Sequence, residues 1–198
     1  MTPAHRLAAL DRLRGIAILL MVLDHALVAA HTLGYDPEWV LMTRLTLTRA
    51  AMPLFMLISG ALWVRQRPRR RRVVAAFIAG LVVETLLAVL WPEFGLPEIM
   101  LLWAGAAALA GVIVRWPIPS LILAYTQWAY WPVAWDGYQP GAVVLFLAVG
   151  VLWGRGSGLK DSSLVNLMPG FLGAIGRYPL TWYLAHLAFL TALVSIGG

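Results

Sequence analysis

Long apolar runs dominate the chain, and its polar residues gather in the short stretches between them. A helix needs about 20 such residues to cross the hydrocarbon core of a bilayer. Seven runs approach this length: residues 13–32, 46–64, 73–91, 98–114, 120–135, 141–153 and 178–196. The pattern predicts an all-α fold, a polytopic transmembrane helical bundle of about seven spans. The fifth and sixth runs are short, so one of them could be tilted or partly re-entrant.

The connections between these runs contain helix-breaking residues. Residues 116–119 (Trp-Pro-Ile-Pro) separate the fourth and fifth runs, and a Gly/Ser-rich loop occupies residues 154–163. Residues 164–175 then predict either a helix at the membrane interface or an early start of the last span. We find no internal repeat and no separate soluble domain, so residues 1–198 are expected to form a single transmembrane domain.

The composition agrees with this pattern. Hydrophobic residues make up 61% of the chain, charged residues make up 12%, and the mean hydropathy is +0.80. Soluble domains contain about 45–50% apolar and about 25% charged residues. The chain has no cysteine, which excludes disulfides, thiolate metal sites and a cysteine acyl-enzyme. We expect no metal cofactor.

The positive charges indicate an orientation. The net charge is +6 and the isoelectric point about 10.3, but the basic residues lie between apolar runs and form no stripe for nucleic acid. The positive-inside rule places the densest block in the cytoplasm. With alternating spans, the N-terminus is then inside and the C-terminus outside, in the cytoplasmic (inner) membrane. Of the basic residues, only Arg44 and Arg49 are then placed on the external side. The block consists of Arg65, Arg67, Arg69, Arg70, Arg71 and Arg72.

Ionisable residues within predicted spans are candidates for function, because they are costly in hydrocarbon. Asp24, His25, Glu84 and His186 are four such residues. Arg14 precedes His25 by eleven positions, which on an α-helix returns to within about 20° of the same face and covers about 16.5 Å. Arg14 and His25 therefore line one face, with Arg14 near the cytoplasm and His25 near the bilayer midplane.

Asp24, next to His25 in the sequence, is predicted to lie on a different face of the helix. Asp24 lies about 100° around the helix from His25, so it cannot pair directly with that ring and is expected to face another span. Each intramembrane residue also has a purely structural interpretation. His25, Glu84 and His186 could simply bond across helices, and Arg14 alone could be an interfacial anchor.

Residues 10–25, LDRLRGIAILLMVLDH, resemble the first helix of membrane acyltransferases. In the acyltransferase-3 family and the related heparan-alpha-glucosaminide N-acetyltransferase family, this helix is similar to Leu-Asp-Gly-Leu-Arg-Gly-Ile-Ala and ends in a His, with ten residues between the Arg and that His. Arg14 and His25 match that spacing. The closing Met-x-x-Asp-His is similar to the TraX pilin-acetylase branch.

Two further segments resemble the same superfamily. Residues 49–60 contain its Pro-Leu-Phe and Ser-Gly elements, and residues 176–186 resemble its closing Tyr-x-x-His segment. The arginine block matches an Arg-x-x-Arg pair in two registers. The resemblance extends over residues 10–75 and 171–190. Typical members have additional helices, so the chain looks like a shortened member, for which a homodimer could compensate.

The resemblance implies transfer of an acyl group, most often acetyl, from cytoplasmic acyl-CoA to an acceptor at or across the membrane. The acceptor would be a glycan, a lipid head group or a protein N-terminus, with membrane lipids as the surroundings. His25 would be the general base or the acyl carrier. Guanidinium groups suit the CoA phosphates, and those expected to bind them belong to Arg14, Arg67, Arg69, Arg70 and Arg72.

Other residues are assigned to the acceptor side. Asp24 would orient the acceptor or a second proton carrier, and Arg49, Tyr183 and His186 would contact the acceptor. Two alternatives remain. A small proton-coupled transporter or flippase would use the midplane Asp, Glu and His as a relay, without needing the Arg14 to His25 register. A packing subunit would tolerate replacement of each polar residue with losses of stability only.

Overall fold

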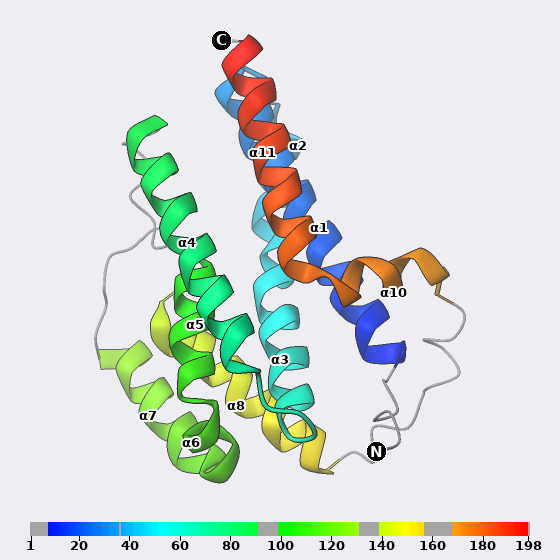
Figure 1. The fold of residues 1–198 in the computed structure, drawn as a ribbon. Helices are drawn as coiled ribbons and strands as arrows, with labels where there is room; N and C mark the ends of the chain where they lie inside the picture. The colour runs from blue at the N-terminus through cyan, green and yellow to red at the C-terminus, as the bar shows by residue number, and fades with distance from the viewer. Residues whose placement is uncertain (1–7, 36, 91–98, 131–138, 157–167, 198) are drawn as a thin grey trace. The chain divides into compact units, whose positions relative to one another are not determined.

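The computed structural model describes residues 8–35, 37–90, 99–130, 139–156 and 168–197, and within these ranges every regular element is helical (Figure 1). The all-α prediction is confirmed for this part of the chain. The elements are α1 (Ala8–Thr32), α2 (Glu38–Thr46), the 3₁₀ turn η1 (Thr48–Ala50), α3 (Ala51–Trp63), α4 (Arg70–Leu90), α5 (Ile99–Ala108), α6 (Ala110–Arg115), α7 (Pro117–Tyr130), α8 (Pro140–Gly156), α10 (Gly170–Arg177) and α11 (Pro179–Gly197).

Prolines mark the starts of three helices. Pro117, Pro140 and Pro179 are the first residues of α7, α8 and α11. Proline is favoured there because its missing N–H would have no intrahelical partner and its φ is already helical. The residue before a proline disfavours the α conformation. Tyr178 accordingly lies at φ −122° and ψ 56°, and this break separates α10 from α11.

The helices follow most of the predicted runs. The first, third and last predicted spans coincide with α1, α4 and α11 to within a few residues. The fourth is divided at Leu109, where φ −89° and ψ 6° interrupt the helix between α5 and α6. The short helix α2 was not predicted. Parts of the predicted 73–91, 98–114, 120–135 and 164–175 segments, and most of the predicted loop at 154–163, lie outside the described residues.

Two helices in the described residues are long and apolar enough to cross a membrane. They cover Ala8–His31, with a hydropathy of 1.9, and Pro179–Ile196, with a hydropathy of 1.5. Shorter apolar helices cover Ala51–Trp63, Ile99–Ala108 and Pro140–Gly156. The structure thus supports two of the seven predicted spans. The count of seven and the N-in, C-out orientation find no support in it and stay predictions.

The chain divides into two compact units, of which the first comprises Met1–Phe55 and Leu159–Gly198. In this unit α1 packs against α10 and α11 (Figure 1). The approach of α1 to α10 requires glycine. A Cβ on Gly15 would collide with the backbone of Leu172, and one on Gly176 would collide with the Asp11 carbonyl. The glycine of the Arg-Gly pair in the first-helix motif therefore has a packing role.

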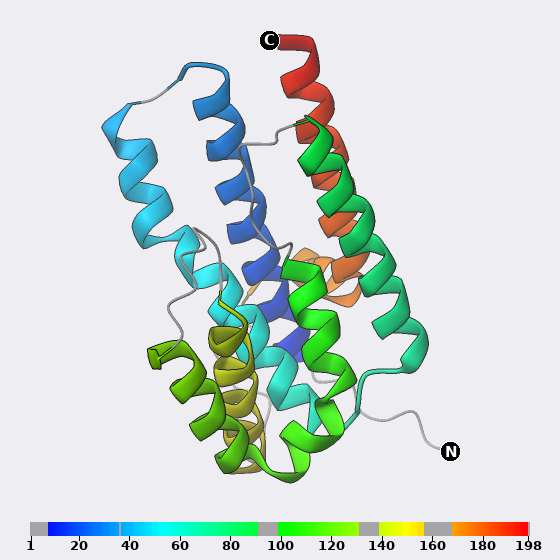
Figure 2. The same ribbon diagram turned by 90° about the vertical axis from the view of Figure 1, so that its left-hand side faces the viewer.

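The second unit comprises Met56–Gly158. Here α7 packs along α8, and α4 along α5 (Figure 2). Glycines again bring backbones together: a Cβ on Gly60 would collide with the Leu147 carbonyl, and one on Gly150 with the Leu57 carbonyl. The Ser-Gly element of the second motif thus lies where another helix backbone passes.

Candidate functional site

Two histidines from distant parts of the sequence meet within the first unit. Nδ1 of His25 on α1 lies 2.7 Å from Nε2 of His186 on α11, a hydrogen-bonding distance. His186 is 8% exposed. Sequence reasoning had singled out both residues, as a reactive group and an acceptor contact, but had not paired them.

The two imidazole rings meet edge to edge. Their planes differ by only 8°, and their centroids are 5.0 Å apart. With nitrogens 2.7 Å apart, this centroid separation is about as large as the two ring radii allow, so the N···N contact lies along the ring planes. An imidazole N–H and an imidazole lone pair both point in the ring plane. The geometry is therefore that of a near-linear hydrogen bond.

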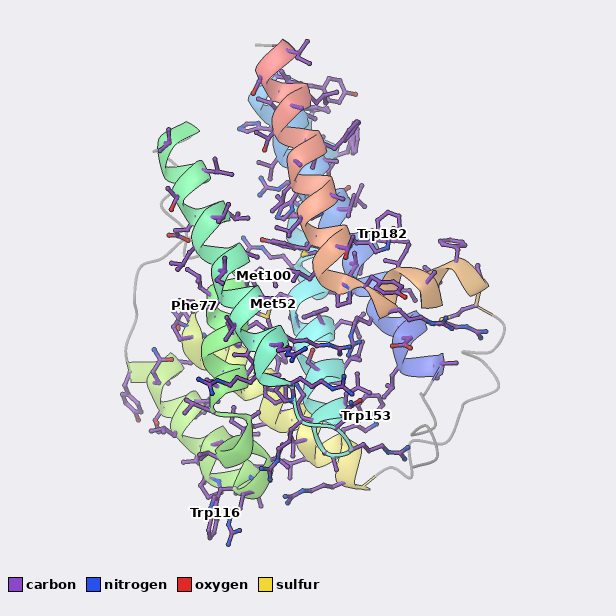
Figure 3. All side chains as sticks on the ribbon, viewed as in Figure 1. Met52, Phe77, Met100, Trp116, Trp153 and Trp182 are labelled. Atoms are coloured by element: carbon purple, nitrogen blue, oxygen red, sulfur yellow. The ribbon has the colours of Figure 1, made fainter. Side chains whose placement is uncertain are left out.

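The second ring nitrogen of His186 is also engaged. Nδ1 of His186 lies 2.9 Å from the backbone carbonyl oxygen of Trp182, one helical turn earlier on α11. Trp182 is labelled near the start of α11 in Figure 3. The chain of contacts thus runs from the Trp182 carbonyl through both ring nitrogens of His186 to Nδ1 of His25.

Tyr183 borders both histidines. Its ring is edge-on to His25, with centroids 6.4 Å apart, and edge-on to His186, with centroids 5.5 Å apart. Tyr183 precedes His186 by three positions, so both project from one face of α11. Only 4% of Tyr183 is exposed. The three rings form a compact cluster, which we call the histidine pair and its tyrosine.

Arg14 lies on the same side of α1 as His25, because it too contacts the C-terminal helices. Its Nη1 donates to the Gly176 carbonyl at 3.3 Å, and lies 3.6 Å from Oδ1 of Asp11. The Arg14 side chain is 14% exposed and that of Asp11 is 6% exposed. Gly176 belongs to the last turn of α10, where carbonyls lack intrahelical donors. Arg14 therefore caps α10, a structural role alongside the predicted one.

Asp24 faces α2. Its Oδ1 lies 3.5 Å from Nε of Arg44, and both side chains are about one-third exposed, at 31% and 34%. Arg49 is exposed in η1. Sequence reasoning missed Arg44 as a partner of Asp24, although a signal existed: Arg44 is one of the two basic residues that the predicted topology leaves outside.

The arginine block lies in the second unit, at the end of α3 and the start of α4. Arg67, Arg69, Arg70 and Arg72 are exposed. Where α4 begins, an open hollow is lined by basic and apolar side chains together: Arg70, Arg71, Val74, Ala75 and Ile78.

The comparison with protein families bears on the first part of the chain. Residues 7–91 match the acyltransferase domain of the acyltransferase-3 family. This confirms the resemblance predicted from the first-helix motif. With the two long apolar helices, it supports a membrane acyltransferase in general. No curated protein and no solved structure matches the chain.

The acyltransferase match covers part of the candidate site. It includes Arg14, Asp24, His25 and the arginine block, whereas Tyr183 and His186 lie beyond it. Among the residues that the structure describes, no group of three or more His, Cys, Asp or Glu side chains could hold a metal ion.

Proposed function

We propose that the chain is a membrane-embedded acyltransferase that moves an acyl group, acetyl in the simplest case, from cytoplasmic acyl-CoA to an acceptor at or across the inner membrane. The observation that carries this proposal is the placement of His25. It lies within an apolar helix of the family-matched segment and is hydrogen-bonded at 2.7 Å to a second histidine.

His25 serves the transfer in one of two ways. As a general base, it takes the proton from the acceptor hydroxyl or amine while that oxygen or nitrogen attacks the thioester carbonyl. The C–S bond then breaks, and the CoA thiolate recovers the proton. As an acyl carrier, a ring nitrogen of His25 attacks the thioester carbonyl, the C–S bond breaks, and CoA leaves as the thiol with a proton released by the acylated ring. The acceptor then displaces the acyl group from the ring and returns its own proton to it.

In this proposal the donor is held by guanidinium groups. Arg14, with Arg67, Arg69, Arg70 and Arg72, binds the CoA phosphates through charge-assisted, multidentate hydrogen bonds. The exposure of the block, which follows α3 and begins α4, supports access from water. Five N–H donors allow one guanidinium to serve several partners, so the Arg14 contact with Gly176 is compatible with phosphate binding.

The acceptor side is assigned to residues around His25. Asp24, adjacent in sequence and paired with Arg44, orients the acceptor, while Arg49 and Tyr183 contact it. The acceptor class is a glycan, a lipid head group or a protein N-terminus. A homodimer would supply the additional helices of longer family members.

The second candidate is a proton-coupled transporter or flippase. The same histidine pair favours it, because two hydrogen-bonded imidazoles within an apolar helix pair suit a proton relay. The two candidates differ in ligand: a transporter of this kind has no affinity for CoA.

The deciding experiment measures CoA binding by calorimetry in nanodiscs, together with release of free thiol from labelled acetyl-CoA. We expect binding by the wild-type protein and weaker binding by Arg14→Gln. Inserting one alanine between Arg14 and His25 rotates the histidine by about 100° and shifts it by about 1.5 Å, so binding should survive while transfer is lost. Absence of CoA binding by a well-folded wild-type protein would refute the acyl-CoA donor.

A further inference from the structure

We propose that His186 is a positioning residue that fixes the tautomer of His25 and makes Nε2 of His25 the reactive atom. This inference rests on the proposed acyl transfer, and it replaces the acceptor contact that the sequence suggested for His186. It follows from the direction of the hydrogen bonds that join Trp182, His186 and His25.

The direction is set at the Trp182 carbonyl. A carbonyl oxygen only accepts hydrogen bonds, so Nδ1 of His186, 2.9 Å away, carries the proton. In a neutral imidazole the other nitrogen then holds a lone pair. Nε2 of His186 is therefore an acceptor.

The contact between the rings then has only one donor. Because Nε2 of His186 accepts, Nδ1 of His25, at 2.7 Å, must donate its proton to it. Neutral His25 consequently carries its proton on Nδ1 and its lone pair on Nε2. The near-coplanar rings, 8° apart, favour this assignment, because donor and lone pair both lie in the ring planes.

The arrangement also accounts for the charge that appears during transfer. When Nε2 of His25 accepts the proton of the acceptor, the ring becomes positive. Its Nδ1–H bond to His186 strengthens, since charge-assisted hydrogen bonds are about twice as strong as neutral ones. The Nδ1 proton can also pass to Nε2 of His186, whose Nδ1–H remains on the Trp182 carbonyl. Return of that proton to Nδ1 of His25, with release of the first proton from Nε2 to the CoA thiolate, restores the starting state.

Both nitrogens of His186 are engaged within the protein, so the ring has no nitrogen left for an acceptor. Tyr183, edge-on to both rings at 6.4 and 5.5 Å, limits their rotation. The pair therefore resembles the orienting arm of a catalytic triad, in which a partner at Nδ1 aims the other nitrogen.

The kinetic test uses thiol release from acetyl-CoA in nanodiscs with water as the acceptor, so that loss of an acceptor contact has no effect. His186→Leu should lower kcat by about 10²- to 10⁴-fold with little change in KM for acetyl-CoA. His186→Gln should recover about tenfold of this loss, because its amide oxygen can accept the His25 Nδ1–H bond. His31→Gln, an exposed histidine on the same helix as His25, is the matched control and should keep the wild-type rate.

A spectroscopic test does not depend on acyl transfer. In protein labelled with ¹⁵N-histidine, only four residues give signals, and substitution assigns each one. We expect His25 to show a protonated Nδ1 and an unprotonated Nε2, and His186→Leu to mix the two tautomers of His25. An unprotonated Nδ1 in wild-type His25, or an unchanged kcat in folded His186→Leu, would overturn the inference. Failure of the wild type to release thiol would refute the proposed function alone, because the tautomer would still be decided by the spectra.

Discussion

The histidine pair and the arginine block are both rich in ionisable side chains, yet their surroundings are opposite. His186 and Tyr183 are buried, and each ring nitrogen of His186 has a partner within 2.9 Å. Arg67, Arg69, Arg70 and Arg72 are exposed at the junction of α3 and α4. The proposed action of the histidine pair depends on the distances and directions of its hydrogen bonds. The proposed binding of phosphates by the arginine block depends mainly on its total positive charge.

This difference has consequences for mutation. Removing a group from an enclosed hydrogen-bonded site leaves its partner without compensation. Removing one charge from an exposed cluster changes a screened attraction that neighbouring charges share. We therefore expect large, all-or-none effects in the histidine pair and small, graded, salt-dependent effects in the block.

The largest expected effect comes from His25→Ala, which should lower thiol release from acetyl-CoA by about 10²- to 10⁴-fold, because it removes the proposed base or acyl carrier. CoA affinity should be nearly unchanged. Combining it with His186→Ala should add little further loss, since the two residues act as a unit. Near-normal turnover by folded His25→Ala would refute the role of His25 as base or acyl carrier. It would also remove the contrast between the histidine pair and the arginine block.

A smaller effect is expected at the contact between α10 and α1, the helix that carries His25. Gly176→Ala places a methyl group against the Asp11 carbonyl and should destabilise the fold by about 1–3 kcal/mol. Thermal unfolding in detergent measures this. Gly105→Ala is the control, because nothing described lies near its added Cβ, and in the interior of α5 it should stabilise by roughly 0.5–1 kcal/mol. Equal unfolding temperatures for the two variants would contradict the close approach of Gly176 to the Asp11 carbonyl.

The arginine block should give a weaker, graded response. Neutralising Arg69 and Arg72 together to Gln should weaken CoA binding by roughly two- to tenfold, and the difference from wild type should shrink as salt rises. Calorimetry at two salt concentrations measures this. Arg115→Gln, outside the block and positioned over the Trp116 ring at 5.8 Å, should bind CoA as the wild type does. A salt-independent loss would mean that the block, too, is a site of defined geometry.

The smallest effect is expected for the Asp24–Arg44 pair. Both side chains are about one-third exposed, and such ion pairs contribute about 0.2–1 kcal/mol. A double-mutant cycle with Asp24→Asn and Arg44→Gln, followed by thermal unfolding, should give a coupling in this range. A much larger coupling free energy would mean that Asp24 behaves like the buried histidine pair and not like an exposed ion pair.

The sequence predicted much of the helical structure because apolar runs and prolines act locally. The run at 178–196 became α11, which starts at Pro179, and the run at 73–91 became α4. Local pattern failed at Leu109, which is apolar like its neighbours but interrupts the helix between α5 and α6. The short α2 was missed because it precedes a longer apolar run and has no helix-breaking residue of its own to separate the two.

The site was predictable only in part, for a similar reason. Helical periodicity placed Arg14 and His25 on one face, and in the structure both contact the C-terminal helices. Periodicity describes one helix and carries no information on its partner, so the pairing of His25 with His186, 161 positions away, could not follow from it. The capping of α10 by Arg14 was hidden likewise, because the carbonyl that it binds belongs to the backbone of a distant segment.

The 161-position separation of the paired histidines has a consequence for biosynthesis. A ribosome makes α1 first and α11 last among the described helices, so His25 has no partner until the 161 residues after it have been made. On our proposal a nascent chain held in the translocon lacks the oriented imidazole until α11 has been inserted. Chains in which α11 is not yet inserted would then not hydrolyse acetyl-CoA, and insertion of α11 would activate the enzyme.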